Sequence, residues 1–259
     1  MNELLTTVGP SQLVGFLLVL TRLVPLFIFA PLFSSRMIPF RVRGIIAVAL
    51  AIGMAPLALA GQVAPTDAMS ILGLIAKELL VGLAFAFAVG ILFHALSIAG
   101  ALLDTLIGFS FGAAVDPMTG NQGTILSQFY TLMGVMIFIA INGDAMLIRG
   151  FSETFALVGI LETPALGQLL DGAISAFSGI FYAAVQICAP VMLALILTDL
   201  AFGLVTKVVP QLNVFSLGLP TKVIVGVVIM AASLPFVAGF LTSELERSVA
   251  TALGSLGVS

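Results

Sequence analysis

The chain has 259 residues, of which 61% are hydrophobic and 8% charged, with a mean hydropathy of +1.27 and a formal net charge of −3 at pH 7. A soluble domain averages roughly 25% charged residues, so most of this chain must face lipid or other apolar protein. The small net charge and the absence of a basic run exclude nucleic acid as a partner.

Long apolar segments follow one another along the chain and predict an all-α integral membrane protein. A spanning helix needs about 20 mostly apolar residues. The segments of suitable composition are residues 13–33, 44–60, 68–103, 125–141, 173–209 and 221–241. Residues 68–103 exceed one bilayer crossing and indicate either a tilted helix or one that leaves the membrane region. A transmembrane barrel needs short alternating segments of about 10 residues, whereas these runs are continuous.

Basic residues gather in two connections between the apolar segments. Arg36, Arg41 and Arg43 lie in the first connection, and Lys207 and Lys222 flank the last one. Positive loops stay in the cytoplasm, so both connections are expected there, with the N-terminus on the other side. No cleavable signal pattern is present, and the first apolar segment is expected to remain in the mature protein.

Residues 104–123, DTLIGFSFGAAVDPMTGNQG, resemble neither apolar flank. They hold four glycines and an Asp116-Pro117 break. Glycine costs a helix about 1 kcal/mol against alanine, and proline about 3 kcal/mol. Irregular backbone at membrane depth survives only where protein buries it or water wets it. The stretch is therefore predicted to be a flexible loop at the middle of a channel-like assembly, with the rest of the chain as its scaffold.

The sequence from Gly108 through Ser110 to Gly112 matches the G-x-S-x-G pattern of serine hydrolases. That pattern requires a strand before it, a helix after it and a later histidine. The chain's single histidine, His94, comes earlier, and both flanks are expected to be helical. A hinge of small residues is the preferred interpretation, and Ser110→Ala tests the alternative.

Ionisable residues inside apolar runs cost several kcal/mol unless they are paired or wet. They are Arg22, Lys77, Glu78, His94, Asp104 and Asp199. Buried structural pairing and contact with a water-filled path or partner chain both remain open. Lys77 and Glu78 are neighbours on different helix faces, so each is expected to find its partner elsewhere. His94 has no second ligand at metal-binding spacing, and the lone Cys188 is expected to be a small core residue.

Gly82, Ala86 and Gly90 repeat every four residues on one expected helix face. Such faces let two backbones approach closely in a membrane. Packing within the chain and contact with another subunit are both consistent with the spacing.

Several motifs resemble the FliR family of the flagellar export apparatus and its virulence type III secretion counterparts. The resemblance covers nearly the whole chain. Its motifs are Arg41-Val-Arg43, Gly108-Phe-Ser110, Val115-Asp116-Pro117, Asn142-Gly143 and the most specific one, PQLNVFSLGLPTK from Pro210 to Lys222. Many relatives carry a histidine after Asn-Gly where this chain has Asp144, so no role is transferred to that position.

The resemblance implies a non-enzymatic subunit, without cofactor or metal, of a flagellar type III protein export gate. It implies helical hairpins, a FliP-like part over residues 1–172 and a FliQ-like part over residues 173–259. The implied partners are FliP-like and FliQ-like subunits, an FlhB-like protein, membrane lipid and unfolded export substrates. The implied location is the bacterial inner membrane at the flagellar basal body, partly on the periplasmic side.

In this family a loop plugs the pore, and by position it corresponds to about residues 106–122. The residues expected to form the plug are Gly108, Phe109, Ser110, Phe111, Gly112, Asp116 and Pro117. Glycine supplies backbone freedom and phenylalanine can fill a narrow lumen. Opening such a seal exposes apolar area at about 25 cal/mol per Å², a modest cost for a gate.

The connector between the last two apolar segments is expected to pack as a turn or to contact a partner. Its candidate residues are Pro210, Asn213, Phe215, Gly218 and Pro220. Asn213 is expected to satisfy free backbone groups, and Pro220 is expected to begin the last helix, where its missing N–H is harmless.

A secondary transporter is the alternative function, because broken helices and intramembrane charges occur there too. It predicts two similar halves, which the sequence lacks. A virulence type III homologue is the alternative within the same family.

Overall fold

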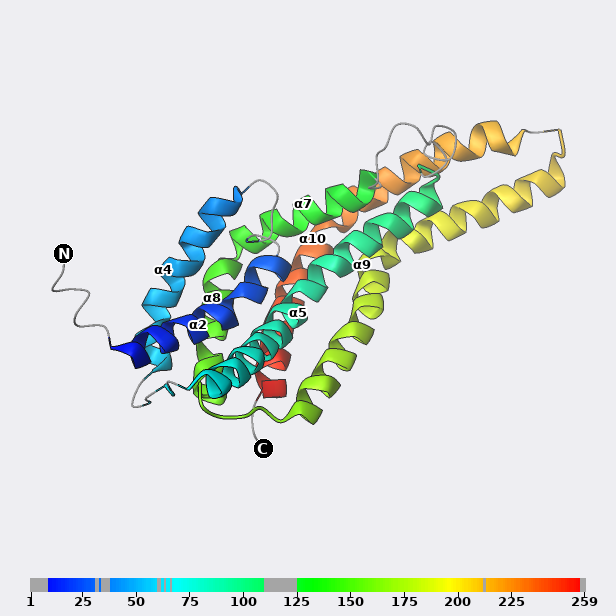
Figure 1. The fold of residues 1–259 in the computed structure, drawn as a ribbon. Helices are drawn as coiled ribbons and strands as arrows, with labels where there is room; N and C mark the ends of the chain where they lie inside the picture. The colour runs from blue at the N-terminus through cyan, green and yellow to red at the C-terminus, as the bar shows by residue number, and fades with distance from the viewer. Residues whose placement is uncertain are drawn as a thin grey trace. The chain divides into compact units, whose positions relative to one another are not determined.

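The computed structural model of the protein describes residues 9–30, 33, 38–59, 62, 64–65, 67–109, 125–211 and 213–256. Every regular element in these ranges is an α-helix (Figure 1), which confirms the predicted all-α class. The helices are α2 (Pro10–Phe29), α4 (Phe40–Ala58), α5 (Ala68–Ile107), α7 (Ile125–Ala140), α8 (Gly143–Leu157), α9 (Leu166–Val208) and α10 (Val214–Leu256).

Five of the helices in the described ranges, α2, α4, α5, α9 and α10, are long and apolar enough to cross a membrane. The pair α7 and α8 adds a sixth candidate if it forms one broken span. Helices α5, α9 and α10 contain 40, 43 and 43 residues. At 1.5 Å per residue each reaches about 60 Å, twice the roughly 30 Å of hydrocarbon that a bilayer offers. The predicted excess length of the third apolar segment is therefore confirmed.

The chain forms two compact units. Unit 1 comprises residues 1–91, 142–177 and 245–259, and unit 2 comprises residues 92–141 and 178–244. The FliP-like part at residues 1–172 and the FliQ-like part at residues 173–259 were inferred from resemblance to other proteins, and this division stays a prediction.

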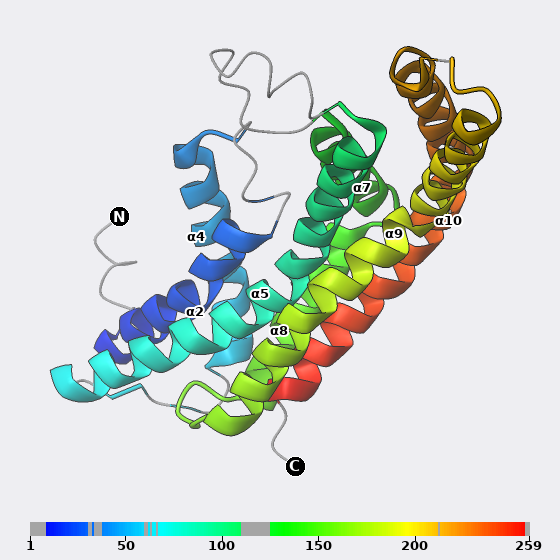
Figure 2. The same cartoon turned by 90° about the vertical axis from the view of Figure 1, so that its right-hand side faces the viewer.

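Unit 1 gathers α2, α4 and α8 with the first half of α5 and short ends of α9 and α10. Buried Val81 of α5, Val158 just after α8, Leu169 of α9 and Leu256 of α10 form an apolar cluster. In both views α2 lies beside α4 (Figures 1 and 2). Segments distant in sequence thus share one core.

Unit 2 contains an antiparallel hairpin of α9 and α10 that runs side by side in Figures 1 and 2. Asp199 and Lys222 form an ion pair across it at 2.5 Å. Leu195, four residues before Asp199, lies 3.7 Å from the Cβ position of Gly226, four residues after Lys222. The second half of α5 pairs with α7, where the rings of Phe93 and Phe138 meet edge to face with centroids 5.6 Å apart.

The last helix begins earlier than the sequence indicates. Pro220 does not start it: α10 begins at Val214, and Pro220 lies inside. Asn213 explains the difference, because its side-chain oxygen accepts the N–H of Ser216 at 3.2 Å and so caps the helix. Pro220 removes one interior N–H, a loss that membrane helices tolerate. The capping role predicted for Asn213 is confirmed.

Candidate functional site

A cluster of charged side chains is buried inside unit 1. Arg22 comes from α2, and Lys77 and Glu78 come from α5; we call these three residues the charge cluster. Arg22 and Glu78 have no exposed surface, and Lys77 keeps 9%. A charge at membrane depth is expensive unless it is paired, so the contacts of the cluster explain how the fold holds it.

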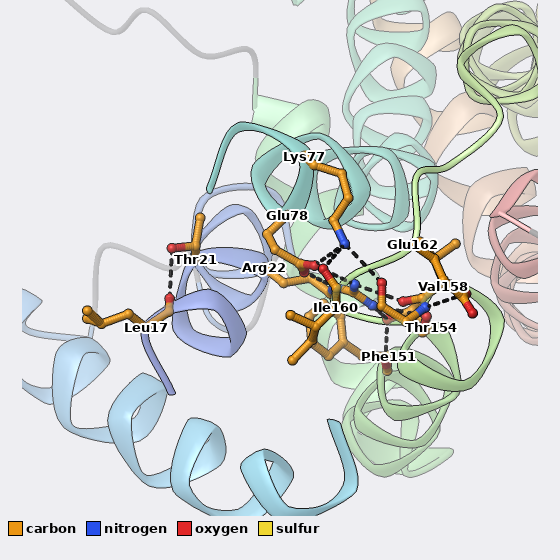
Figure 3. Close-up of polar contacts among 11 residues, drawn as sticks. Leu17, Thr21, Arg22, Lys77, Glu78, Phe151, Thr154, Val158, Ile160 and Glu162 are labelled. Atoms are coloured by element: carbon orange, nitrogen blue, oxygen red, sulfur yellow. Dashed lines mark hydrogen bonds and ion pairs between the residues drawn. The ribbon is translucent and has the colours of Figure 1, made fainter. Parts of the chain in front are cut away.

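Arg22 uses its whole guanidinium group (Figure 3). Nε and Nη2 both donate to the carboxylate of Glu78, the latter at 2.9 Å. Nη1 donates to the carbonyl of Thr154 at 3.0 Å, and Nη2 also donates to the carbonyl of Val158 at 2.9 Å. The ring of Phe155 lies 4.2 Å from the guanidinium carbon. This fork-like, stacked arrangement suits arginine and not lysine.

Lys77 binds the same carboxylate as Arg22. Its Nζ lies 2.6 Å from Oε1 of Glu78, and it donates to the carbonyls of Gly159 at 2.9 Å and Ile160 at 2.6 Å. The expectation that each of these neighbours finds an opposite charge elsewhere is confirmed for Glu78, which binds Arg22, and is wrong for Lys77, which binds Glu78. The flexible stem of lysine bends toward the position that the two carbonyls fix for its ammonium group.

The carbonyls that complete the cluster lie at and just beyond the C-terminal end of α8, which ends at Leu157. This end carries the negative pole of the helix and leaves carbonyls without helical partners, so it attracts cations. Glu162 closes the following turn by accepting the N–H of Gly159 at 2.9 Å. The cluster contains two cations and one carboxylate, and backbone carbonyls with the nearby acid Glu162 offset its excess positive charge.

The cluster joins three helices and has no arrangement for acid–base chemistry. Both oxygens of Glu78 are engaged by cations. Sequence patterns found the three ionisable side chains, but they missed Thr154 and the backbone carbonyls of residues 158–160. No side-chain pattern in the sequence points to these carbonyls, because the tertiary fold sets their positions.

The face formed by Gly82, Ala86 and Gly90 lies against α2 within unit 1. A Cβ atom on Gly82 would meet the carbonyl oxygen of Arg22 at 2.0 Å, and one on Gly90 would meet that of Phe29 at 2.9 Å. Ala86 is fully buried. Glycine is thus needed where α2 crosses α5, beside the charge cluster. A further contact of this face with another subunit stays a prediction.

A second polar arrangement lies in unit 2, where α5 ends and α7 begins. Asp104 is fully buried, and its Oδ2 accepts the N–H of Leu126 at 2.9 Å and that of Ser127 at 3.4 Å. Ser97 and Ser127 share a hydrogen bond of 2.7 Å. A Cβ on Gly100 would lie 2.4 Å from the backbone of Ser127. These contacts hold the two helix ends that border the glycine-rich stretch.

The predicted plug residues fall mostly outside the described part of the chain. Ser110, Phe111, Gly112, Asp116 and Pro117 all lie there.

Gly108 and Phe109 are described. Gly108 follows the last residue of α5 with a φ of +99°, a conformation that favours glycine, and its N–H bonds to the carbonyl of Asp104 at 3.1 Å. Phe109 is half-buried in the turn that follows α5.

The other predicted positions occupy separate places. Pro210 lies in the turn between α9 and α10, and Phe215 and Gly218 lie in the first turns of α10. His94 is exposed on α5. No group of three or more potential metal ligands exists among the described residues.

The helices, their lengths and the buried cluster define an all-α integral membrane protein stabilised by internal ion pairs. The chain belongs to the FliR family: a model described as "Bacterial export proteins, family 1" matches residues 13–248.

Relatives resemble the chain over most of its length. Flagellar biosynthetic protein FliR of Escherichia coli (strain K12) is 30% identical over 240 residues, which cover 92% of each chain. FliR of Bacillus subtilis (strain 168) is 32% identical over 223 residues, covering 83% of this chain and 84% of the relative. Surface presentation of antigens protein SpaR of Salmonella typhimurium is 24% identical over 222 residues, covering 85% and 81%.

Proposed function

We propose that this protein is a non-enzymatic subunit of the flagellar type III protein export gate. With FliP-like and FliQ-like subunits it forms the channel for unfolded export substrates, and an FlhB-like protein associates with it. The observation that carries the proposal is 30% and 32% identity to two flagellar FliR proteins over 92% and 83% of the chain. SpaR is less similar to the chain, at 24% identity, than these two FliR proteins, which supports flagellar use.

The apolar surface of the long hairpin supports membership of a larger assembly. Only 17% of the apolar window of α10 is buried within the chain. Leu193, Leu200, Leu204 and Val228 are each at least 58% exposed. A membrane protein can cover such a surface with lipid or with neighbouring helices. The excess of α9 and α10 over one bilayer thickness supports an assembly that extends beyond the membrane. We place this assembly at the inner membrane and the basal body, with its extension on the periplasmic side.

We further propose that residues 106–122 form the plug of this gate. Asp104 and Gly108 support this assignment from the described side: the first joins the helix ends at the base of the loop, and the second ends α5 with a glycine turn. Phe109 and Phe111 supply apolar area to exclude water, and Gly108 and Gly112 supply backbone freedom.

Deletion of residues 108–115 tests the plug. We expect an ion leak across the inner membrane because the apolar seal is removed. Membrane potential and filament-protein export are measured together, with recovery of the FliP-like subunit as the control for assembly. A matched variant with Phe109 and Phe111 changed to serine keeps the loop length. An unchanged leak in both assembled variants would count against the plug role.

Ser110→Ala separates the gate from a hydrolase. The gate predicts unaltered export, because it requires no nucleophile at residue 110. Loss of export in a variant that still assembles would favour the hydrolase interpretation. Substrate uptake by the purified chain alone, in liposomes, would instead favour a secondary transporter.

A further inference from the structure

Helix α4 has one face turned into unit 1 and another that no described residue covers. Its buried face consists of Ala47, Ala51, Met54 and Ala58, toward α2 and α8. The outer face carries a groove of about 580 Å³. The groove is lined by Arg41, Gly44, Ile45, Val48, Ala49 and Ile52.

The surface that lines the groove is apolar along its length, and the aliphatic part of Arg41 lines one end. Ile45, Val48 and Ile52 are 69%, 40% and 61% exposed. Gly44 has no atom within 4 Å of its Cβ position, so the wall is open there. Arg41 is exposed in the first turn of α4, and its side chain has no hydrogen bond or ion pair with any described residue.

The length of the groove along α4 is close to the thickness of one bilayer leaflet. From Arg41 to Ile52 the helix rises about 16 Å, given 1.5 Å per residue. The hydrocarbon core of a bilayer is about 30 Å thick, so a leaflet contributes about half of that. Arginine at the end of a spanning helix places its charge among the headgroups while the helix continues into hydrocarbon.

We propose that the groove on α4 binds an anionic phospholipid. The guanidinium of Arg41 binds the phosphate, for which its planar donors are suited, and an acyl chain lies against Gly44, Val48 and Ile52. The positive pole at the N-terminus of α4 favours the same anion. The topology predicted from the basic connections places Arg41 on the cytoplasmic side, where anionic lipid attracts basic residues. A partner helix fits less well, because it would cross both leaflets and does not require a cation at Arg41.

Lipid retention by the purified full-length chain, with any subunits that co-purify, tests this proposal. The protein is reconstituted in nanodiscs of equal phosphatidylglycerol and phosphatidylcholine, released, and examined by native mass spectrometry. We expect retained phosphatidylglycerol to exceed phosphatidylcholine by about fivefold, the factor for about 1 kcal/mol per basic residue at an anionic surface. Arg41→Gln should bring the ratio to about one, and Arg41→Lys should give an intermediate value.

Groove-filling variants test the position of the acyl chain. Gly44→Leu has open space and should lower retention of both lipids. Gly53→Leu, on the same helix but outside the groove, also has open space and is the matched control. Arg149→Gln removes one exposed arginine elsewhere in unit 1. Both controls should retain lipid as the unaltered chain does.

Three results would overturn the proposal. They are equal retention of the two lipids by the unaltered chain, the same ratio after Arg41→Gln, and equal loss in Gly44→Leu and Gly53→Leu. A photo-crosslinking amino acid at Val48 supplies an independent readout. Crosslinks to lipid support the proposal, whereas crosslinks to another polypeptide would assign the groove to a protein partner. These measurements do not depend on export and remain decisive if the gate function is wrong.

Discussion

Glu78 is shared by two buried cations, and this makes it the least replaceable member of the charge cluster. Arg22 binds it through two nitrogen atoms and Lys77 through one. Replacing a whole buried ion pair with apolar residues can be neutral, but removal of one partner leaves uncompensated charge. Loss of Glu78 would leave two such charges.

Glu78→Ala is expected to lower the free energy of unfolding by about 3–5 kcal/mol, because the remaining cations keep only backbone oxygen. Thermal and denaturant unfolding in detergent measures the change. Glu153→Ala, an exposed acid on α8, is the control for loss of one carboxylate. Similar stability of the two variants would show that the cluster contributes little.

Gly82 lies beside the charge cluster, at a close approach of the backbones of α2 and α5. Gly82→Ala places a Cβ 2.0 Å from the carbonyl oxygen of Arg22, so the helices must separate. We expect a cost of about 1–3 kcal/mol from overpacking. Gly73→Ala on the same helix has nothing within 4 Å and should be neutral or stabilising. Equal melting temperatures of the two variants would contradict the predicted cost of overpacking at Gly82.

At this scale the sequence predicted which residues are special but not their partners. Arg22, Lys77 and Glu78 stand out because charge is rare in apolar segments. The pairing of Lys77 with Glu78 depends on carbonyls at residues 159 and 160, whose positions come from the tertiary fold. No side-chain pattern encodes them.

Helices α5 and α7 are joined at one end by Asp104. This carboxylate accepts backbone N–H groups from the first turn of α7 and thus supplies a cap from another helix. Its Oδ1 atom has no hydrogen-bond partner in the described part of the chain. One oxygen therefore makes both contacts.

Asp104→Ala is expected to destabilise the protein by about 1–2 kcal/mol, as loss of an N-cap does. Asp104→Asn keeps the accepting oxygen and should remain close to the unaltered protein. Thermal unfolding and recovery of the assembled complex measure both. Equal losses in the two variants would mean that the negative charge, and not hydrogen bonding to α7, is required.

The sequence predicted which segments form helices, but it predicted less well where those helices begin and end. The apolar segments correspond to α2, α4, α5, α7, α9 and α10. The sequence placed the last start at Pro220 because proline favours first turns. The cap at Asn213 outweighed that preference, and the small residues of the tail simply continue α10 to Leu256.

The whole molecule combines well-packed units with a large exposed apolar surface. That surface follows from composition and was predictable, since 61% of the residues are hydrophobic. The division of the chain into two units was not predictable, because α5, α9 and α10 each contribute residues to both units. Residues 110–122 of the predicted plug lie outside the described ranges, and the plug stays a prediction.

Co-purification tests the molecular environment of the chain. We expect FliP-like and FliQ-like subunits to elute with it from mild detergent, because neighbouring helices can cover apolar area that a monomer leaves to lipid. Size-exclusion chromatography followed by peptide identification provides the measurement. A stable monomer from cells that produce all the subunits would contradict the assignment.

The burial of Cys188 makes the natural chain suitable for site-directed labelling. It is the single cysteine in the sequence, and none of its surface is exposed. Maleimide reagents should therefore bypass it and react with a cysteine introduced at a chosen exposed position. Fluorescent or spin probes can then follow individual sites during export without first replacing a native thiol.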